Sequence, residues 1–274
     1  MNLYLTGSGK TTLLALICSD HPQSYSLPIR IFGRGRLPRL GQPGISIFDI
    51  QARIGQSSPE IHAFFPRNLT IRQTLQNAWA DTFLGTPQLS DKRCSLVDHC
   101  LRWFESELNP GFRSDGKDQS LEYAVFQSKS THWADTLRFG DAPFSSQRVA
   151  LFLRALVKTP DLVVLDEAFS GMDESVRDKC MLFLAWGGTR HFRVSRAKKT
   201  VVMTDPRVWG DLRMNGLTEE QALICVSHVK EEVPGLVREW MCLPEAVEGN
   251  PPQFGRFAGP LEGYESEWNT VWQT

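Results

Sequence analysis

The residues best suited to chemistry form a loop close to the start of the chain, Thr6-Gly7-Ser8-Gly9-Lys10-Thr11-Thr12. This run matches the second half of the phosphate-binding motif G-x-x-x-x-G-K-[ST]. Gly7 and Gly9 let the backbone turn its N–H groups toward a polyphosphate, and the N-terminus of the helix that follows adds positive dipole. Lys10 is predicted to reach the β- and γ-phosphates, and Thr11 to offer its hydroxyl to Mg²⁺.

The loop departs from the full motif at its first position, where Tyr4 stands instead of glycine. Only residues 1–3 remain for the strand that ordinarily leads into such a loop. The alternative is a Gly/Ser turn that caps an ordinary helix. The helix itself is predicted from Leu13, Leu14 and Ile17, which lie at helical spacing.

A second candidate group is the apolar run LVVL at 162–165, which ends in Asp166 and Glu167. Asp166 at the strand end is predicted to hold Mg²⁺ through water, and Glu167 to polarise a water for attack on the γ-phosphate. By itself such an acidic strand end is commonly a solvated loop. Coupled to the Lys10 loop, it predicts a site for ATP with Mg²⁺ as cofactor.

Helices and strands alternate around these residues. We predict helices over 10–18, 70–80, 90–108, 145–157 and 174–185, and strands over 29–32, 45–50, 162–165, 200–203 and 222–227. Strands separated by helices predict an α/β fold with a mostly parallel sheet. Open sheets of this kind collect their ligands at the C-terminal ends of the strands, so Lys10 and Asp166 should face one pocket.

The order of these motifs resembles that of the ATP-binding-cassette (ABC) ATPases. The run QRVALFLRAL at 147–156 looks like the signature helix, LDE at 165–167 like Walker B, and SGMD at 170–173 like the D-loop. ICVSH at 224–228 is similar to the switch-histidine strand. More narrowly, SSPE at 57–60, FFP at 64–66 and LDEAFSGMD resemble a fungal branch of soluble ABC ATPases that is similar to bacterial molybdate-import ATPases.

This resemblance implies a P-loop NTPase domain over 1–248. It would contain a helical subdomain at about 69–145 and an insertion at about 187–218, followed by a Pro/Gly/aromatic tail over 249–274. It implies that Glu167 and His228 are catalytic, that Thr6 to Thr12 bind the phosphates, that Thr11 and Asp166 hold Mg²⁺, and that Asp173 belongs to the D-loop. Two such domains, as a homodimer or with a second ABC domain, would clasp two ATP molecules. A transporter or another complex is a further candidate partner.

The signature motif LSGGQ is altered. Aligning the run from Gln147 places Ala142-Pro143-Phe144-Ser145-Ser146 on its five positions. Pro143 can donate no N–H. Ser145, Ser146 and Gln147 are therefore the candidates for the contact with the ATP of the partner domain.

Two other family positions are uncertain in the sequence. Counting back from Pro66 makes Glu60 the Q-loop candidate, whereas the nearest glutamine is Gln56. His228 follows Asp166 by 62 residues (228 − 166), more than we expect for the family. His228 could instead be an ordinary strand-end histidine.

The family's N-terminal β-subdomain, with its adenine-stacking aromatic, has no counterpart here, so we expect an N-terminally truncated cassette. Tyr4 is too close to the phosphate loop to take the stacking role. Two alternatives to an ATPase follow. The chain could be a degenerate cassette that binds nucleotide weakly or not at all and acts as a regulatory or scaffold partner, or it could be a truncated gene product.

Composition narrows the class of protein. The 274 residues are 41% hydrophobic and 22% charged with a formal net charge of −1, as in ordinary globular proteins, so no nucleic-acid partner is expected. No apolar run approaches the ~20 residues that span a bilayer, and no signal peptide is evident, so we expect a soluble intracellular protein. The six scattered cysteines suggest reduced thiols. We expect the basic segment at 190–199 to be a solvated loop.

Overall fold

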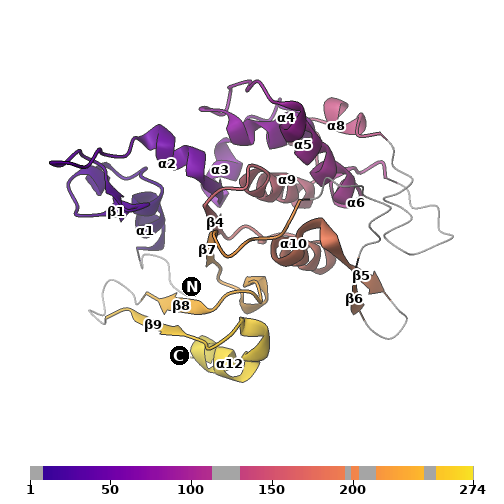
Figure 1. Ribbon diagram of the computed structural model, residues 1–274. Helices are drawn as coiled ribbons and strands as arrows, with labels where there is room; N and C mark the ends of the chain where they lie inside the picture. The colour runs from indigo at the N-terminus through magenta and orange to yellow at the C-terminus, as the bar shows by residue number, and fades with distance from the viewer. Residues whose placement is uncertain (1–8, 113–129, 195–198, 204–213, 244–250, 274) are drawn as a thin grey trace.

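The centre of the molecule is a parallel sheet of three strands in the order β3-β4-β7. The computed structural model describes residues 9–112, 130–194, 199–203, 214–243 and 251–273 (Figure 1). In the sheet, β4 (Leu162–Asp166) pairs with β3 (Ile54–Ser57) on one edge and with β7 (Ala222–Val226) on the other. Every residue of β4 is buried, which explains its continuous apolar sequence.

Alternate side chains of β4 face two different helical layers. Val164 packs in a cluster with residues of α1 (Lys10–Ile17) and α2 (Ile47–Arg53). Val163 packs on the opposite side in the largest apolar cluster, to which α9 (Phe144–Leu156) and α10 (Glu174–Trp186) contribute. Figure 1 shows these helix pairs on either side of the strands. The sheet is thus covered on both faces.

A further layer of helices packs on α9. It consists of α3 (Pro59–Phe64), α4 (Ile71–Gln76), α5 (Asp91–Trp103), α6 (Glu105–Leu108) and α8 (Trp133–Thr136). Two antiparallel strand pairs lie outside the central sheet and before the C-terminal residues: β1 (Arg30–Ile31) with β2 (Arg34–Gly35), and β5 (Arg190–Val194) with β6 (Lys199–Met203). Short 3-10 turns occur along the chain: η1 (Pro22–Tyr25), η2 (Asn77–Trp79), η3 (Phe139–Asp141), η4 (Gly187–Thr189), η5 (Lys230–Glu232) and η6 (Leu261–Gly263). The predicted helical subdomain at about 69–145 covers most of this layer, although residues 113–129 lie outside the described part of the chain.

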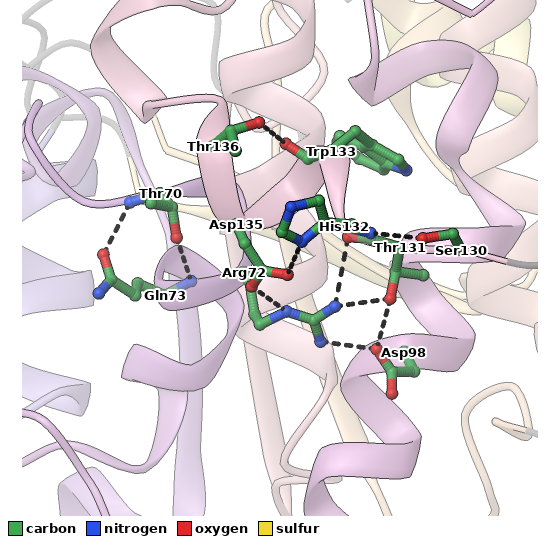
Figure 2. A network of polar contacts seen from close by, with 10 residues as sticks. All are labelled: Thr70, Arg72, Gln73, Asp98, Ser130, Thr131, His132, Trp133, Asp135 and Thr136. Atoms are coloured by element: carbon green, nitrogen blue, oxygen red, sulfur yellow. Dashed lines mark hydrogen bonds and ion pairs between the residues drawn. The ribbon is translucent and has the colours of Figure 1, made fainter.

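One arginine holds three helices of this layer together (Figure 2). Arg72 of α4 donates to Asp98 of α5 and to Asp135 of α8, each at 2.6 Å, and to the hydroxyl of Thr131 at 2.6 Å. Only 18% of the Arg72 side chain is exposed. Charge-assisted bonds from a rigid guanidinium fix both distance and direction, so this network sets how the helices are arranged.

The C-terminal residues form a small unit of their own. β8 (Glu239–Cys242) pairs antiparallel with β9 (Gln253–Arg256), and α12 (Glu265–Gln273) contributes Trp268, which is 3% exposed, to a separate apolar cluster. The predicted boundary at 248/249 falls between the two strands of this pair and stays a prediction. In the part of the chain that the structure describes, no helix has both the length and the apolar character needed to cross a bilayer.

All five predicted helices are confirmed, as are four of the five strands. The strand predicted over 45–50 is wrong, because a helix begins there. The Ser46 hydroxyl accepts from the Asp49 N–H at 3.0 Å, and the Asp49 carboxylate accepts from the Ser46 N–H at 3.3 Å. This capping box starts α2, and the sheet strand follows it as β3.

The solvated loop expected over the basic segment is also wrong in part. Its first residues form β5, which pairs antiparallel with β6. At the start of β5 the Arg190 guanidinium lies 3.6 Å from the centre of the Trp186 ring. A cation stacked on an aromatic face keeps its charge near water while packing its flat side, so basic composition is compatible with a strand here.

The contact between β3 and α9 gives a test of the fold. A methyl group at Gly55 would lie 1.8 Å from the carbonyl oxygen of Ala155 and 2.8 Å from the ring of Pro160. Gly55→Ala should therefore lower the free energy of unfolding by about 3 kcal/mol or more, measured by urea denaturation. Gly263→Ala is the matched control, since nothing lies within 4 Å of its added methyl group. Equal stability of the two variants would show that this packing is described wrongly.

Candidate active site

The described part of the candidate phosphate loop is Gly9 and the start of α1. Gly9 precedes the helix with φ of +83°, in the left-handed region that glycine adopts without strain, and its carbonyl accepts from the Leu13 N–H at 2.9 Å. Lys10 and Thr11 are therefore the first residues of the helix, and Thr12 is exposed beside them. The predicted phosphate-binding residues Thr6, Gly7 and Ser8 lie outside the described residues.

Three side chains from distant parts of the sequence meet next to this helix. The Lys10 Nζ atom lies 3.1 Å from His228 Nε2, and the same ring nitrogen lies 2.9 Å from Glu167 Oε1. Glu167 directly follows β4, and His228 comes two residues after the end of β7. Because parallel strands end at the same edge of a sheet, the fold brings these residues together.

The backbone of Glu167 is held in an unusual conformation. Its φ is +46°, in the left-handed region, which side chains other than glycine disfavour. Its N–H donates to the Val226 carbonyl at 2.8 Å, while its carbonyl accepts from a guanidinium N–H of Arg148. The Arg148 Nε also donates to the Ser170 carbonyl at 3.2 Å. The turn that contains Glu167 is thus bonded both to β7 and to α9.

Asp166 at the end of β4 lies where a negative charge is disfavoured. Its side chain is buried, and burial together with the charges of Glu60 and Glu167 raises its pKa to about 6. Lys10 and Arg148 act in the opposite direction. Burial also lowers the pKa of Lys10, against the attraction of Glu167 and Asp166. The site therefore holds more carboxylates than its own cations neutralise.

This arrangement fits a magnesium ion. Thr11 and Asp166 line one cavity of about 600 Å³ together with Glu60, whose carboxylate is exposed at the second position of α3. Mg²⁺ prefers hydroxyl, carboxylate and phosphate oxygens, and a divalent cation would relieve the crowding of negative charge around Asp166. Thr11 and Asp166 are the residues that would hold it, with Glu60 nearby. The metal roles of these residues stay predictions.

The candidates at the start of α9 are largely engaged within the domain. The Ser146 hydroxyl donates to the Glu107 carbonyl at 2.6 Å. The Gln147 amide bonds to His62 Nε2 and to the Ala142 carbonyl, both at 2.8 Å. Among the described residues, the Ser145 hydroxyl makes no such bond. The role of these three residues toward a second domain stays a prediction.

The aromatic ring at the first position of α9 was not singled out from the sequence. Phe144 is 53% exposed, its ring lies edge-on to His62 with centroids 4.9 Å apart, and it rests against Gly171. Gly171 has a φ of +77° and lies in the predicted D-loop, whose Asp173 is exposed at the N-cap of α10. The D-loop and the start of α9 therefore form one continuous surface.

Comparison with known proteins agrees with these motifs, although no family model matches the chain. The chain is 33% identical over 231 residues to the Schizosaccharomyces pombe "Uncharacterized ABC transporter ATP-binding protein C323.04", covering 84% of this chain and 36% of that protein. It is 33% identical over 193 residues to the Saccharomyces cerevisiae "Uncharacterized ABC transporter ATP-binding protein YDR061W", covering 67% and 31%. To the Escherichia coli "ABC transporter ATP-binding protein ModF" it is 32% identical over 176 residues, covering 61% and 28%. The chain thus spans about a third of the length of these relatives.

Solved structures share the fold. The dimeric bacterial ABC transporter cassette MJ0796 matches with a TM-score of 0.53 at 14% identity, covering 94% of this chain and 84% of that one. The protein cbiO1 from Clostridium perfringens, part of the ABC transporter complex cbiONQ, matches with a TM-score of 0.52 at 14% identity, covering 99% of this chain and 81% of that one. At this identity the likeness shows the fold alone.

The helix that begins beside Gly9 and the acidic end of a buried parallel strand define a P-loop nucleotide-binding domain of the α/β class. Together with its relatives, this places the chain in the family of ABC ATPases. The resemblance seen in the sequence is confirmed, including the presence of fungal proteins among the relatives.

The raised pKa of Asp166 predicts a pH dependence of stability. The folded state binds this proton more tightly than the unfolded state, whose carboxyl keeps the usual pKa of 3.8. The stabilising contribution is therefore fully present below about pH 4 and is lost as the pH rises through 6. With the partly solvated surroundings allowed for, ionised Asp166 should cost the ligand-free protein about 1–2 kcal/mol above that pH.

Asp166→Asn should accordingly raise the free energy of unfolding by about 1–2 kcal/mol at pH 8 and change it little at pH 4, since the amide stays neutral. Urea denaturation without added metal at the two pH values measures this difference. Asp141→Asn, at an exposed position, is the control and should change stability equally little at both. A variant no more stable than wild type at pH 8 would contradict the description of the site.

Proposed function

We propose that this chain binds Mg-ATP and hydrolyses it as an ABC ATPase domain. The observation that carries the proposal is the contact of Lys10 and Glu167 with the same nitrogen of His228, at 3.1 and 2.9 Å. It brings together a phosphate-loop lysine, a strand-end carboxylate and a histidine that lie far apart in the sequence. Membership of the ABC ATPase family supports the same function.

The shared nitrogen cannot satisfy both neighbours at once. If His228 Nε2 carries a proton, that nitrogen donates to Glu167 and does not accept from Lys10; if it is bare, it accepts from Lys10 and does not donate to Glu167. A phosphate group placed at Lys10 would add an anionic acceptor for the ammonium, so that Lys10 would no longer compete with Glu167 for the His228 nitrogen. Nucleotide binding would then leave His228 free to donate either to Glu167 or to the γ-phosphate.

The chemical step assigns a separate task to each residue. Mg²⁺, when bound, neutralises developing charge on the phosphate oxygens. Lys10 binds the β- and γ-phosphates, and Asp166 and Thr11 orient the metal. The Glu167 carboxylate accepts a hydrogen bond from the attacking water and takes its proton as the water adds to the γ-phosphorus. The bond from the γ-phosphorus to the bridging oxygen breaks in the same step, so that ADP leaves and inorganic phosphate is formed. His228 senses the γ-phosphate by donating to it.

A second ABC domain is proposed to complete the site. The start of α9 would face the γ-phosphate held by Lys10 of the partner, where the positive end of a helix favours an anion. The partner would be a second copy of this domain or another ABC domain. A transporter or another complex is proposed as the machinery that the ATPase drives, since the relatives carry the name of ABC transporter ATP-binding proteins.

The start of α9 also supports the alternative, a cassette that binds nucleotide weakly or not at all and serves as a regulatory or scaffold partner. Pro143 is the N-cap and supplies no capping side chain, while Ser146 and Gln147 are bonded inside the domain. Fewer donors therefore remain for a partner's phosphate. Turnover measurements distinguish the two functions.

Glu167→Gln separates hydrolysis from binding. Glutamine keeps the size and one oxygen but cannot take the proton, so kcat should fall by about 10²–10⁴-fold while the Kd for Mg-ATP changes by less than about threefold. The variant should also accumulate an ATP-bound dimer, measured by light scattering. Glu219→Gln, at an exposed position after the predicted insertion, should hydrolyse ATP like wild type.

The outcomes separate the hypotheses clearly. Unchanged turnover in Glu167→Gln would place the base elsewhere, with His228 next to be tested. Loss of ATP binding as well would make Glu167 a structural residue. If wild type bound ATP but hydrolysed it no faster than Lys10→Ala, the binding-partner function would replace the ATPase function.

A further inference from the structure

A buried arginine on α9 is bonded to the turn that presents Glu167. Arg148 is 3% exposed and belongs to the inner face of the helix, where its neighbours Val149 and Leu151 are fully buried. A buried charge is costly unless hydrogen bonds satisfy it. No carboxylate among the described residues forms an ion pair with Arg148. Its guanidinium instead donates to main-chain carbonyls of one turn, while the carboxylates of Glu167, Glu232 and Asp166 attract its charge from a longer distance.

The two carbonyls that Arg148 bonds mark the two ends of one tight turn. Nη2 donates to the Glu167 carbonyl, and Nε donates to the Ser170 carbonyl at 3.2 Å. The turn is closed by the Ser170 N–H, which donates to the Glu167 carbonyl at 3.2 Å. A planar guanidinium presents donors in a fixed fork, which suits two acceptors at a fixed separation.

This bonding stabilises a conformation that Glu167 would otherwise avoid. With a φ of +46°, its backbone needs support on both sides, and receives it from Val226 on the N–H and from Arg148 on the carbonyl. The direction in which the Glu167 side chain leaves the strand, toward His228 at 2.9 Å, follows from this backbone conformation.

We propose that Arg148 is a positioning residue for Glu167: its fork holds the turn at 167–170 so that the carboxylate meets the attacking water. The inference rests on the proposed function, in which Glu167 takes the proton of that water. Phe144 extends the arrangement to the surface, since its ring lies 5.9 Å from the Arg148 guanidinium and against Gly171, which directly follows the turn.

Arg148→Lys tests the proposal, because lysine keeps the charge but loses the fork. We expect kcat for ATP to fall by about 10–100-fold, while KM and the Kd for Mg-ATP change less than about threefold. In a Glu167→Gln background the same substitution should lower the residual rate less than about twofold, since a residue that acts through Glu167 has nothing left to position.

The control is Arg72→Lys, which breaks the partly buried guanidinium network of the helical layer, away from the site. It should leave kcat within about twofold of wild type even where it lowers Tm. Hydrogen exchange gives a readout that does not depend on turnover. Arg148→Lys should speed exchange of the Ser170 amide at least about tenfold, whereas Arg72→Lys should not.

Several results would overturn the proposal. These are an unchanged kcat in Arg148→Lys, an equal loss of rate with and without the Glu167 carboxylate, or an equal loss in Arg72→Lys. Failure of the proposed function has a different signature, namely wild type and Lys10→Ala hydrolysing ATP at the same rate. In that case the positioning role is overturned with it, and the exchange of the Ser170 amide reports only a structural contact.

Discussion

The structure depends on a single buried strand that has parallel neighbours on both edges. With both faces and both edges of β4 covered, the charged residues that follow it can emerge only at the strand's C-terminal end. Asp166 and Glu167 occupy that end, and the parallel pairing with β7 brings His228 beside them. The helix that starts at Lys10 packs on one face of the same sheet, so its first turn reaches the same edge.

The second organising element is α9. Most of its side chains are buried, and through them it joins the sheet to the helical layer whose arrangement Arg72 fixes. The same helix carries Arg148 to the turn at 167–170 and presents Phe144 at its exposed start. A change at the start of α9, such as the docking of a second domain, therefore lies only one turn of helix from a residue bonded to Glu167.

The sequence predicted those helices and strands whose pattern of apolar residues is long and matches their buried surroundings in the structure. The continuous apolar run of β4 and the regular apolar face of α9 are of this kind. The short run around Ile47 and Phe48 suits a strand or a helix equally well by periodicity, and the capping box at Ser46 decides for the helix. Motif order named Lys10 and His228 as residues of one candidate site, but it did not name Arg148. Nothing in the sequence around Arg148 indicates that its hydrogen-bond acceptors lie in the turn at 167–170, beyond β4.

The most direct test of the account is the chemical accessibility of Lys10. Its ammonium should bind the phosphates of Mg-ATP, so acylation of Lys10, followed by mass spectrometry, should slow roughly tenfold at ten times the Kd, where only about one molecule in eleven is free. Lys92, exposed on α5, should react at the same rate with and without nucleotide. Protection of Lys10 alone is the predicted result. Equal labelling of Lys10 in the presence of bound Mg-ATP would contradict the assignment of this site.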